Sequence, residues 1–192
     1  MRGSGARGDT RRDAIAAAAL ELYLERGFGV SIDDVAAAAG ASKQTLYKFF
    51  GGRDGLARAA MELELERVIG PMREATSRDG DAFERLADFA AAYQQVLFSE
   101  RCLAMYRFVI GTANESPDFG RAFNQTVVDY VIGLVTPLIA EVDGDEDDAP
   151  ARAEQFIGAL QGAELNRALA GATPDTTRLA RLRASGLAGL TR

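Results

Sequence analysis

The sequence predicts an all-α protein of about nine helices, with a small N-terminal domain of three helices and a larger C-terminal helical domain. Two observations carry this prediction. First, the helix-favouring residues Ala, Leu, Glu and Arg dominate every long stretch of the 192-residue chain. Second, no stretch shows the sustained alternation of apolar and polar residues that is typical of a half-buried strand.

The first three helices have recognisable start and stop residues. We expect a helix over about residues 10–26 that ends at Gly27, because glycine readily adopts the left-handed conformation that closes many helices. Ser31 and Ser42 are expected to cap the second and third helices by accepting hydrogen bonds from free backbone N–H groups. Gly40 lies between these two helices and is expected to supply the positive φ of a sharp turn.

The remaining helices are placed by apolar periodicity and by the Gly, Pro and Asp residues between them. Gly70-Pro71 is expected to bend or interrupt the helix that begins at Arg53, because proline lacks the N–H of a helical hydrogen bond. The predicted helices cover about residues 53–69, 81–98, 99–112, 118–140, 151–169 and 176–190, with a loop over 141–150.

The composition excludes several classes of protein. The chain has no histidine, which removes His-dependent catalytic triads and imidazole zinc sites, and we expect no enzyme and no cofactor. Charge interrupts each apolar stretch before about 20 residues, so no membrane span is expected. The basic start leads into no signal-peptide core, and Cys102 is the single cysteine. Both features predict a cytoplasmic protein.

One acidic segment resembles part of a calcium-binding loop. The acids at its first, third, fifth and twelfth positions are Asp143, Asp145, Asp147 and Glu154. However, Asp148 stands where such a loop requires glycine, and Pro150 follows it. We therefore expect a solvated acidic linker and no metal site.

Charge is distributed unevenly along the chain. The total is −6, but residues 1–55 hold eight Lys/Arg against seven Asp/Glu, while the remaining residues hold fourteen against twenty-one. A DNA-binding part, if the chain has one, is expected in the first 55 residues.

Residues 31–50 have the pattern of a helix-turn-helix. Val35, Ala36 and Leu46 are expected to face the core, together with Phe49 or Phe50. The outer face and leading end of the second helix then carry Lys43, Gln44, Thr45, Tyr47 and Lys48. Donors, acceptors and cations of this kind contact base edges and phosphates in a major groove. A solvated polar face on a small helical bundle is the alternative.

The segment Ala39-Gly40-Ala41-Ser42-Lys43-Gln44-Thr45-Leu46-Tyr47-Lys48-Phe49-Phe50, followed by Arg53-Asp54-Gly55-Leu56, resembles the N-terminal domain of TetR-family transcriptional regulators. The resemblance extends over residues 11–65. It implies a recognition helix, a homodimer, base or base-adjacent contacts from Lys43, Gln44 and Thr45, and phosphate contacts from Tyr47, Lys48 and Arg53. The full set of expected DNA-binding residues is Ser42, Lys43, Gln44, Thr45, Tyr47, Lys48 and Arg53.

Basic residues also precede the first helix. We divide the chain into a flexible basic arm (1–9), a helix-turn-helix domain (10–55) and a C-terminal effector-binding and dimerisation domain (56–192). Arg2 and Arg7 in the arm, with Arg11 and Arg12 after it, can reach phosphates or a minor groove. A solubilising tail is the alternative.

The C-terminal domain contains a stripe of Met and aromatic residues. Residues 105–110 and 116–123 resemble a TetR subgroup related to AcrR and AefR, which implies a small-molecule pocket between helices. The expected ligand-binding residues are Met61, Leu65, Phe89, Tyr93, Met105, Tyr106, Arg107, Phe123, Asn124 and Val127. Gln125 is a further polar candidate. The alternatives are an ordinary core for the apolar residues and partners on neighbouring helices for the polar ones.

The last two helices are candidates for a subunit interface. Gly158 and Gly162 would let a partner backbone approach closely, and the resemblance implies a four-helix interface built from two helices of each subunit. The expected residues are Phe156, Ala159, Leu160, Ala163, Arg167, Leu179, Leu182 and Leu187. Packing within one chain is the alternative.

Together these observations predict a ligand-responsive, homodimeric, DNA-binding transcriptional regulator, which we expect to be a repressor released from its operator by a small molecule. Its expected partners are an operator duplex, a second copy of the chain and an unidentified effector, and not a membrane. The alternative is a ligand-binding or interaction module of the same fold that lacks operator binding.

Overall fold

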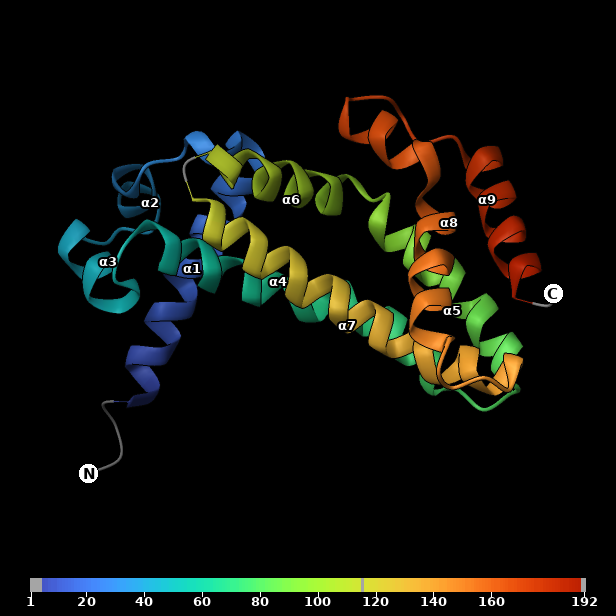
Figure 1. Ribbon diagram of the computed structural model, residues 1–192. Helices are drawn as coiled ribbons and strands as arrows, with labels where there is room; N and C mark the ends of the chain where they lie inside the picture. Colours follow the sequence, from blue (N-terminus) through green and yellow to red (C-terminus); the bar gives the residue numbers. More distant parts are fainter. Residues whose placement is uncertain (1–4, 115, 191–192) are drawn as a thin grey trace. The chain divides into compact units, whose positions relative to one another are not determined.

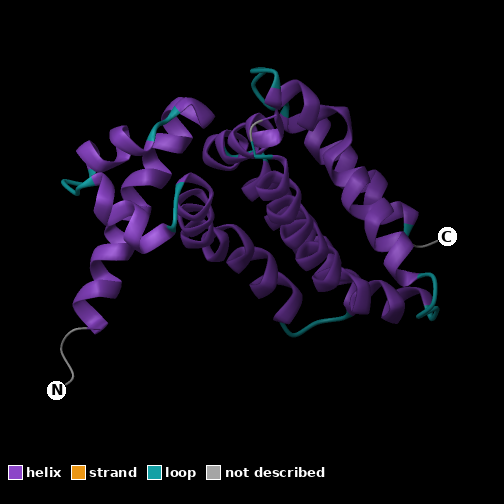
Figure 2. Cartoon of the chain, turned by 60° about the vertical axis from the view of Figure 1, so that its left-hand side comes forward, coloured by secondary structure: helices purple, strands orange, loops and turns teal. Residues whose placement is uncertain are grey.

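The structure, a computed structural model, describes residues 5–114 and 116–190. Within these ranges the chain forms nine α-helices, two short 3-10 helices and no strand (Figure 1, Figure 2). The α-helices are α1 (Gly5–Arg26), α2 (Ile32–Ala38), α3 (Lys43–Phe50), α4 (Arg53–Ser77), α5 (Ala82–Leu97), α6 (Glu100–Gly111), α7 (Pro117–Asp143), α8 (Ala149–Leu169) and α9 (Thr176–Gly189). The all-α prediction is confirmed.

The chain divides into two compact units. The first runs to Arg67 and also includes residues 104–124, while the second comprises residues 68–103 and the part of the chain from Gln125 onward. The first unit therefore contains more than the helix-turn-helix domain that the sequence predicts. It adds the beginning of α4 and the junction between α6 and α7, two segments that the predicted boundary after residue 55 assigns to the C-terminal domain.

Two helix boundaries differ from those expected. Helix α1 begins at Gly5, so residues 5–9 of the predicted flexible arm are helical, whereas residues 1–4, with Arg2, lie outside the described residues. Helix α4 continues through Gly70-Pro71 to Ser77, so of the two expected effects, a bend or an interruption, the interruption was wrong. On this stretch Val68, Ile69, Met72 and Ala75 are buried, and their packing outweighs a proline that costs about 3 kcal/mol inside a helix.

Helix α7 is longer and more apolar than the sequence analysis allowed. Within the described part of the chain it alone has the length and composition to cross a bilayer, with 28% of its most apolar window buried. Its buried residues Val127, Val131, Val135 and Leu138 recur every three or four positions, which is the pattern of a helix that packs one face into a protein core. Asp129 lies in the middle of the helix, and an ionised side chain is costly in hydrocarbon.

Aromatic rings connect three helices in the core of the first unit. The ring centroid of Tyr23 on α1 lies 4.6 Å from that of Phe108 on α6. Phe108 in turn lies 6.3 Å from Phe119 on α7, edge to face, and Phe119 stacks on Phe123 at 6.1 Å. Tyr23 and Phe108 are each 1% exposed, so these rings fix α1 against the end of α6 and the start of α7.

Helices α8 and α9 lie side by side in the second unit (Figure 1). At Gly186 on α9 an added Cβ would lie 3.4 to 3.5 Å from atoms of Phe156, Ala159 and Leu160 on α8. Phe156 and Leu160 are therefore buried within this chain, at 2% and 0% exposure. Packing within the chain, the alternative considered from the sequence, accounts for these two residues.

A kink in α8 brings it close to α9. Gly162 has φ 50° and ψ −159°, which is not helical. A Cβ at this position would lie 2.7 Å from Cδ2 of Leu182 on α9. The sequence analysis expected Gly162 to admit a partner backbone, but the side chain that approaches it belongs to the same chain. Gly158, by contrast, has no atom within 4 Å of its Cβ position.

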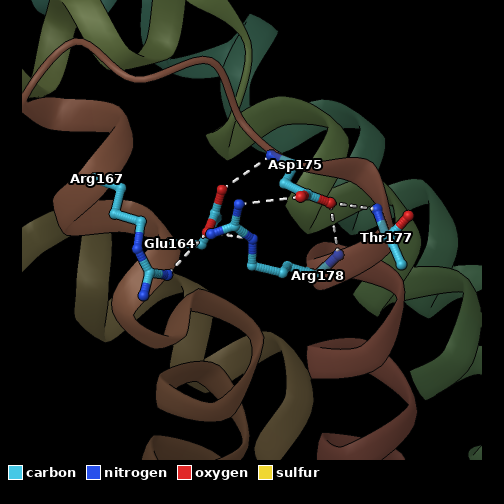
Figure 3. Close-up of polar contacts among 5 residues, drawn as sticks. All are labelled: Glu164, Arg167, Asp175, Thr177 and Arg178. Atoms are coloured by element: carbon cyan, nitrogen blue, oxygen red, sulfur yellow. Dashed lines mark hydrogen bonds and ion pairs between the residues drawn. The ribbon is translucent and has the colours of Figure 1, made fainter.

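The buried carboxylate of Glu164 on α8 holds the segment that leads into α9 (Figure 3). Glu164 is 2% exposed and accepts a hydrogen bond from the backbone N–H of Asp175 at 2.9 Å. Its other oxygen accepts from Arg167 at 3.0 Å and lies 3.6 Å from Nε of Arg178. The Asp175 N–H first, and then these two guanidinium groups, hold the pKa of Glu164 below its usual range.

The acidic loop that follows α7 is held by contacts within the protein. Asp143 forms an ion pair with Arg152, and Oδ1 of Asp145 accepts hydrogen bonds from the N–H groups of Asp147 and Asp148. Across residues 5–114 and 116–190, no three His, Cys, Asp or Glu side chains are grouped as metal ligands.

Candidate nucleic-acid interface

The second helix begins at a complete capping box. The N–H of Asp34 donates to Oγ of Ser31 at 3.1 Å, and the Ser31 N–H donates back to Oδ2 of Asp34 at 2.8 Å. The Ser31 hydroxyl also donates to the same carboxylate at 2.6 Å. The hydroxyl first, and then the backbone N–H, lowers the pKa of Asp34. The prediction of a cap at Ser31 is confirmed, with Asp34 in the reciprocal role.

The turn and the cap of the third helix also follow the sequence. Gly40 has φ 57°, and the N–H of Ala41 donates to the carbonyl of Ala36 across the turn at 2.9 Å. Oγ of Ser42 accepts from the N–H of Thr45 at 3.2 Å, and the two hydroxyl oxygens lie 2.8 Å apart. The hydroxyls of Ser42 and Thr45 therefore hold the first turn of α3.

Helix α3 has a buried face and a polar outer face. Leu46 is fully buried, Phe49 and Phe50 are half-buried, and Tyr47 is 49% exposed. The remaining exposed side chains of the helix are those of Lys43, Gln44 and Lys48. Together with Tyr47 they share one side of the helix, because positions i, i+1, i+4 and i+5 are neighbours on a helical surface. This polar face carries two cations and no acid.

An ion pair holds one of these cations. Nζ of Lys43 lies 3.0 Å from Oδ2 of Asp33, which is in the first turn of α2. The hydrogen bond to Asp33, and then the charge of that carboxylate, raises the pKa of Lys43. The sequence analysis missed Asp33, because no spacing rule pairs side chains ten residues apart across a turn. Any phosphate or base that Lys43 binds must compete with this carboxylate.

Two arginines flank the polar face. Arg53, the first residue of α4, is half-buried. The guanidinium carbon of Arg12 lies 5.4 Å from the ring centroid of Phe50, within the range of a cation–π contact. Arg11 is exposed on the same helix as Arg12. Arg11 and Arg12 thus lie on α1, within the helix that the sequence analysis expected from residue 10 onward, and Arg12 contacts the last residue of α3.

The expected ligand-binding residues are divided between the two units. Met61, Leu65, Met105, Tyr106, Arg107, Phe123 and Asn124 belong to the first unit, and Phe89, Tyr93 and Val127 to the second. Arg107 and Asn124 are exposed, as is Gln125. Tyr93 is buried, stacks on Phe89 at 5.7 Å, and accepts a hydrogen bond from Gln161 at 2.6 Å. A neighbouring helix therefore satisfies the Tyr93 hydroxyl, as one of the alternatives allowed.

Two grooves lie in the second unit, at places where the sequence analysis expected no ligand. One, of about 570 Å³, lies between α5 and α9. At its wall the buried Gln94 donates to the carbonyls of Leu160 and Leu179, each at 3.0 Å, and accepts from Arg183 at 3.1 Å. The other, of about 350 Å³, lies between α8 and α9 beside Ala163 and Leu182, with Arg167, Arg178 and Arg181 at its edge.

The expected interface residues on α8 and α9 differ in exposure. Phe156 and Leu160 are buried in the chain. Ala163 and Arg167 are exposed, and the half-buried members of the set are Ala159, Leu179, Leu182 and Leu187. A surface for a second subunit on these helices would use the exposed and half-buried positions.

Family comparisons match both parts of the chain. A family model described as bacterial regulatory proteins of the tetR family matches residues 15–60. A second, described as the C-terminal domain of AefR-like transcriptional repressors, matches residues 84–185, which is more than half of the chain. No curated protein matches the sequence.

Solved structures share the fold. A protein described as a TetR-family transcriptional regulator from Mesorhizobium loti is 22% identical, with a TM-score of 0.82 and 96% of each chain covered. One from a Rhodococcus species is 22% identical, with a TM-score of 0.75 over 95% of this chain and 100% of the other. The flavonoid-responsive regulator FrrA is 24% identical, with a TM-score of 0.67 and 95% of each chain covered. With the helix-turn-helix in place and both family models matched, the chain belongs to the TetR family of non-enzymatic, DNA-binding transcriptional regulators.

Proposed function

We propose that this protein is a cytoplasmic, homodimeric repressor that binds its operator through α3 and leaves it when a small molecule binds. The observation that carries the proposal is the outer face of α3. Lys43, Gln44, Tyr47 and Lys48 are exposed on one side of a helix that Ser42 caps. A major groove admits an α-helix, and its base edges and flanking phosphates match these donors, acceptors and cations.

Each polar residue of the interface has a role that suits its chemistry. Lys43, Gln44 and Thr45, near the N-terminus of α3, are assigned to base edges or to atoms beside them, because the leading end of a recognition helix approaches the bases. Tyr47 and Lys48, together with Arg53, are assigned to phosphates. The cap at Ser42 fixes the start of the helix, so that these side chains enter the groove in one register.

A second copy of the chain completes the proposed regulator. Two recognition helices must reach half-sites about 34–36 Å apart, which requires a symmetric dimer. The exposed and half-buried residues on α8 and α9, Ala163 and Leu182 among them, supply a surface for that dimer. A coupling of about 1–3 kcal/mol between effector and operator would suffice for a useful switch.

The groove between α5 and α9 is the proposed place to look for an effector, because the groove between α8 and α9 is lined by Ala163 and Leu182, which are assigned to the dimer surface. The one between α5 and α9 combines apolar lining with the polar Gln94 and Arg183, a mixture that is typical of small-molecule sites. Because one protein of this fold is described as flavonoid-responsive, a panel of flavonoids is a reasonable first set of probes. Each compound is tested by whether it displaces the protein from bound duplex.

The decisive experiment first selects, from a pool of random duplexes, the fragments that the protein binds. It then measures how binding changes when side chains of the polar face of α3 are replaced by alanine. We expect a palindromic consensus and tight binding by the natural protein. The triple variant Lys43→Ala/Tyr47→Ala/Lys48→Ala should lose at least about a hundredfold in affinity, since each contact contributes about 1 kcal/mol or more. The salt dependence of binding should also become shallower, by about one unit of slope for each phosphate contact removed.

A matched variant controls for the loss of positive charge. Arg78→Ala/Arg121→Ala also removes two cations, both from exposed sites on other elements, and should retain binding. Circular dichroism and sedimentation should show the same fold and the same assembly for all three proteins. Failure of the natural protein to enrich any duplex, while it remains folded and dimeric, would instead identify a ligand-binding or interaction module.

A further inference from the structure

One hydrogen bond joins two distant segments of the first unit. The hydroxyl of Ser116, just before α7, donates to Oδ2 of Asp54 at 2.6 Å, although the residues are 62 positions apart. Ser116 is 8% exposed, and Asp54 is the second residue of α4. A short hydrogen bond between a largely buried hydroxyl and a carboxylate is among the stronger side-chain contacts.

The serine end of this bond is fixed by its surroundings. The N–H of Ser116 donates to the carbonyl of Thr112 at 2.7 Å. Thr112 is fully buried, and its hydroxyl donates to the carbonyl of Val109 at 2.6 Å. A Cβ on Gly120 would lie 2.7 Å from that hydroxyl oxygen. The backbone of Ser116 is therefore tied to the buried Thr112, whose own hydroxyl is engaged in the same junction.

The aspartate end is in contact with the recognition helix. A Cβ on Gly55 would lie only 1.9 Å from the carbonyl oxygen of Phe50, the last residue of α3. The first turn of α4 thus lies directly against the end of α3. A displacement of Asp54 along α4 is transmitted to α3, because no gap separates the two backbones.

Tyr23 on α1 lies near the charged residues at the start of α4. Burial raises the pKa of Tyr23 to about 12, while the charge of Arg53 lowers it and that of Asp54 raises it. The two charges at the start of α4 therefore lie near the Tyr23 hydroxyl, and the Tyr23 ring packs on Phe108 of α6. Tyr23 thus connects α6, through the Phe108 ring, with the charged residues at the start of α4.

From these contacts we propose that Ser116 is a positioning residue for the recognition helix: its hydroxyl fixes the first turn of α4 through Asp54, and thereby fixes α3 for entry into the groove. The inference rests on the proposed binding of duplex DNA by α3. The bond also engages the Asp54 carboxylate as a hydrogen-bond acceptor. Released from Ser116, this carboxylate would stand next to Arg53 and compete with the phosphate assigned to that arginine.

The first test needs no DNA. Hydrogen exchange of the backbone amides in residues 43–56 is measured in the natural protein and in Ser116→Ala, Ser116→Thr and Ser77→Ala. Exchange in this segment should accelerate in Ser116→Ala and return close to the natural rate in Ser116→Thr, which restores a hydroxyl. Ser77→Ala removes a hydroxyl that donates to the carbonyl of Arg73, and it should leave residues 43–56 unchanged.

The second test measures affinity for the duplex that the natural protein selects. Ser116→Ala should bind about five- to tenfold more weakly, because a hydrogen bond to a solvent-exposed carboxylate contributes about 1 kcal/mol. In a double-mutant cycle, Ser116→Ala should have no further effect once Asp54 is already alanine. Equal affinities of the natural protein and Ser116→Ala, or an undiminished effect in the Asp54→Ala background, would overturn the proposal.

The outcomes separate this inference from the proposed function. If the natural protein selects no duplex, the proposed function fails, while hydrogen exchange still decides whether Ser116 orders α3. Unchanged exchange in Ser116→Ala overturns the positioning role even where DNA binding is intact. Should Ser116→Ala fail to fold, Asp54→Ala removes the same bond from its exposed end, and it must then show the faster exchange in residues 43–56.

Discussion

Substituting Gly162 by alanine should destabilise the protein, mainly through the backbone. The backbone at φ 50° and ψ −159° lies in a region that is essentially restricted to glycine, and holding another residue there costs about 1–3 kcal/mol. The new Cβ would also lie 2.7 Å from Cδ2 of Leu182, but this atom is the end of a half-buried side chain that can shift, so the contact adds little. The predicted loss in the free energy of unfolding is therefore about 1–3 kcal/mol.

The assay is thermal and urea unfolding followed by circular dichroism. For a protein of this size each kcal/mol shifts the Tm by about 2–4 °C, so Gly162→Ala should melt at least about 2 °C lower. Gly158→Ala is the matched control, because its Cβ meets no atom within 4 Å and alanine favours a helix. Adding Leu182→Ala to Gly162→Ala should cost less than the sum of the two single changes. A Tm for Gly162→Ala equal to that of Gly158→Ala would refute the reasoning.

Three further predictions concern other contacts. Asp33→Asn removes the competitor of Lys43, so duplex affinity should rise about two- to fivefold at low salt and the gain should shrink at high salt; an unchanged or weaker affinity would contradict it. Glu164→Gln should make the free energy of unfolding depend less on pH in the acid range. The pKa of Glu164 is lowered in the folded state, chiefly by the Asp175 N–H, so its contribution is complete above its unfolded pKa and is lost as the pH falls through the folded value. Urea midpoints at about pH 7 and at about pH 3, well below the unfolded pKa, measure this, and equal losses in both proteins would exclude the role. Leu46→Ala, at a fully buried site, should lower the free energy of unfolding by about 2–5 kcal/mol, seen as a lower urea midpoint, and a neutral effect would show that α3 is not anchored through this side chain.

The local features of the helix-turn-helix could be predicted because they depend on residues close in sequence. Ser31 with Asp34, and Ser42 with Thr45, are capping pairs three residues apart. Gly40 has the positive φ that its place in the turn predicts. In each case a rule about residues close in sequence was enough to predict the local backbone structure.

Features that depend on distant residues could not be predicted in this way. The continuation of α4 through Pro71 depends on what Val68 and Met72 pack against, which no local rule reveals. The same holds for the bond between Asp54 and Ser116, and for the grouping of the α6–α7 junction with the first unit. Spacing along the chain indicates which face a residue occupies, but not which distant element covers that face.

The amide of Gln94 connects three helices at once. It donates to the carbonyl of Leu160 on α8, two residues before the kink at Gly162, and kinks turn carbonyls away from their helical partners. It also donates to the carbonyl of Leu179 on α9. A side chain without an N–H at position 94 would therefore remove, in one step, the link from α5 to both of the last two helices.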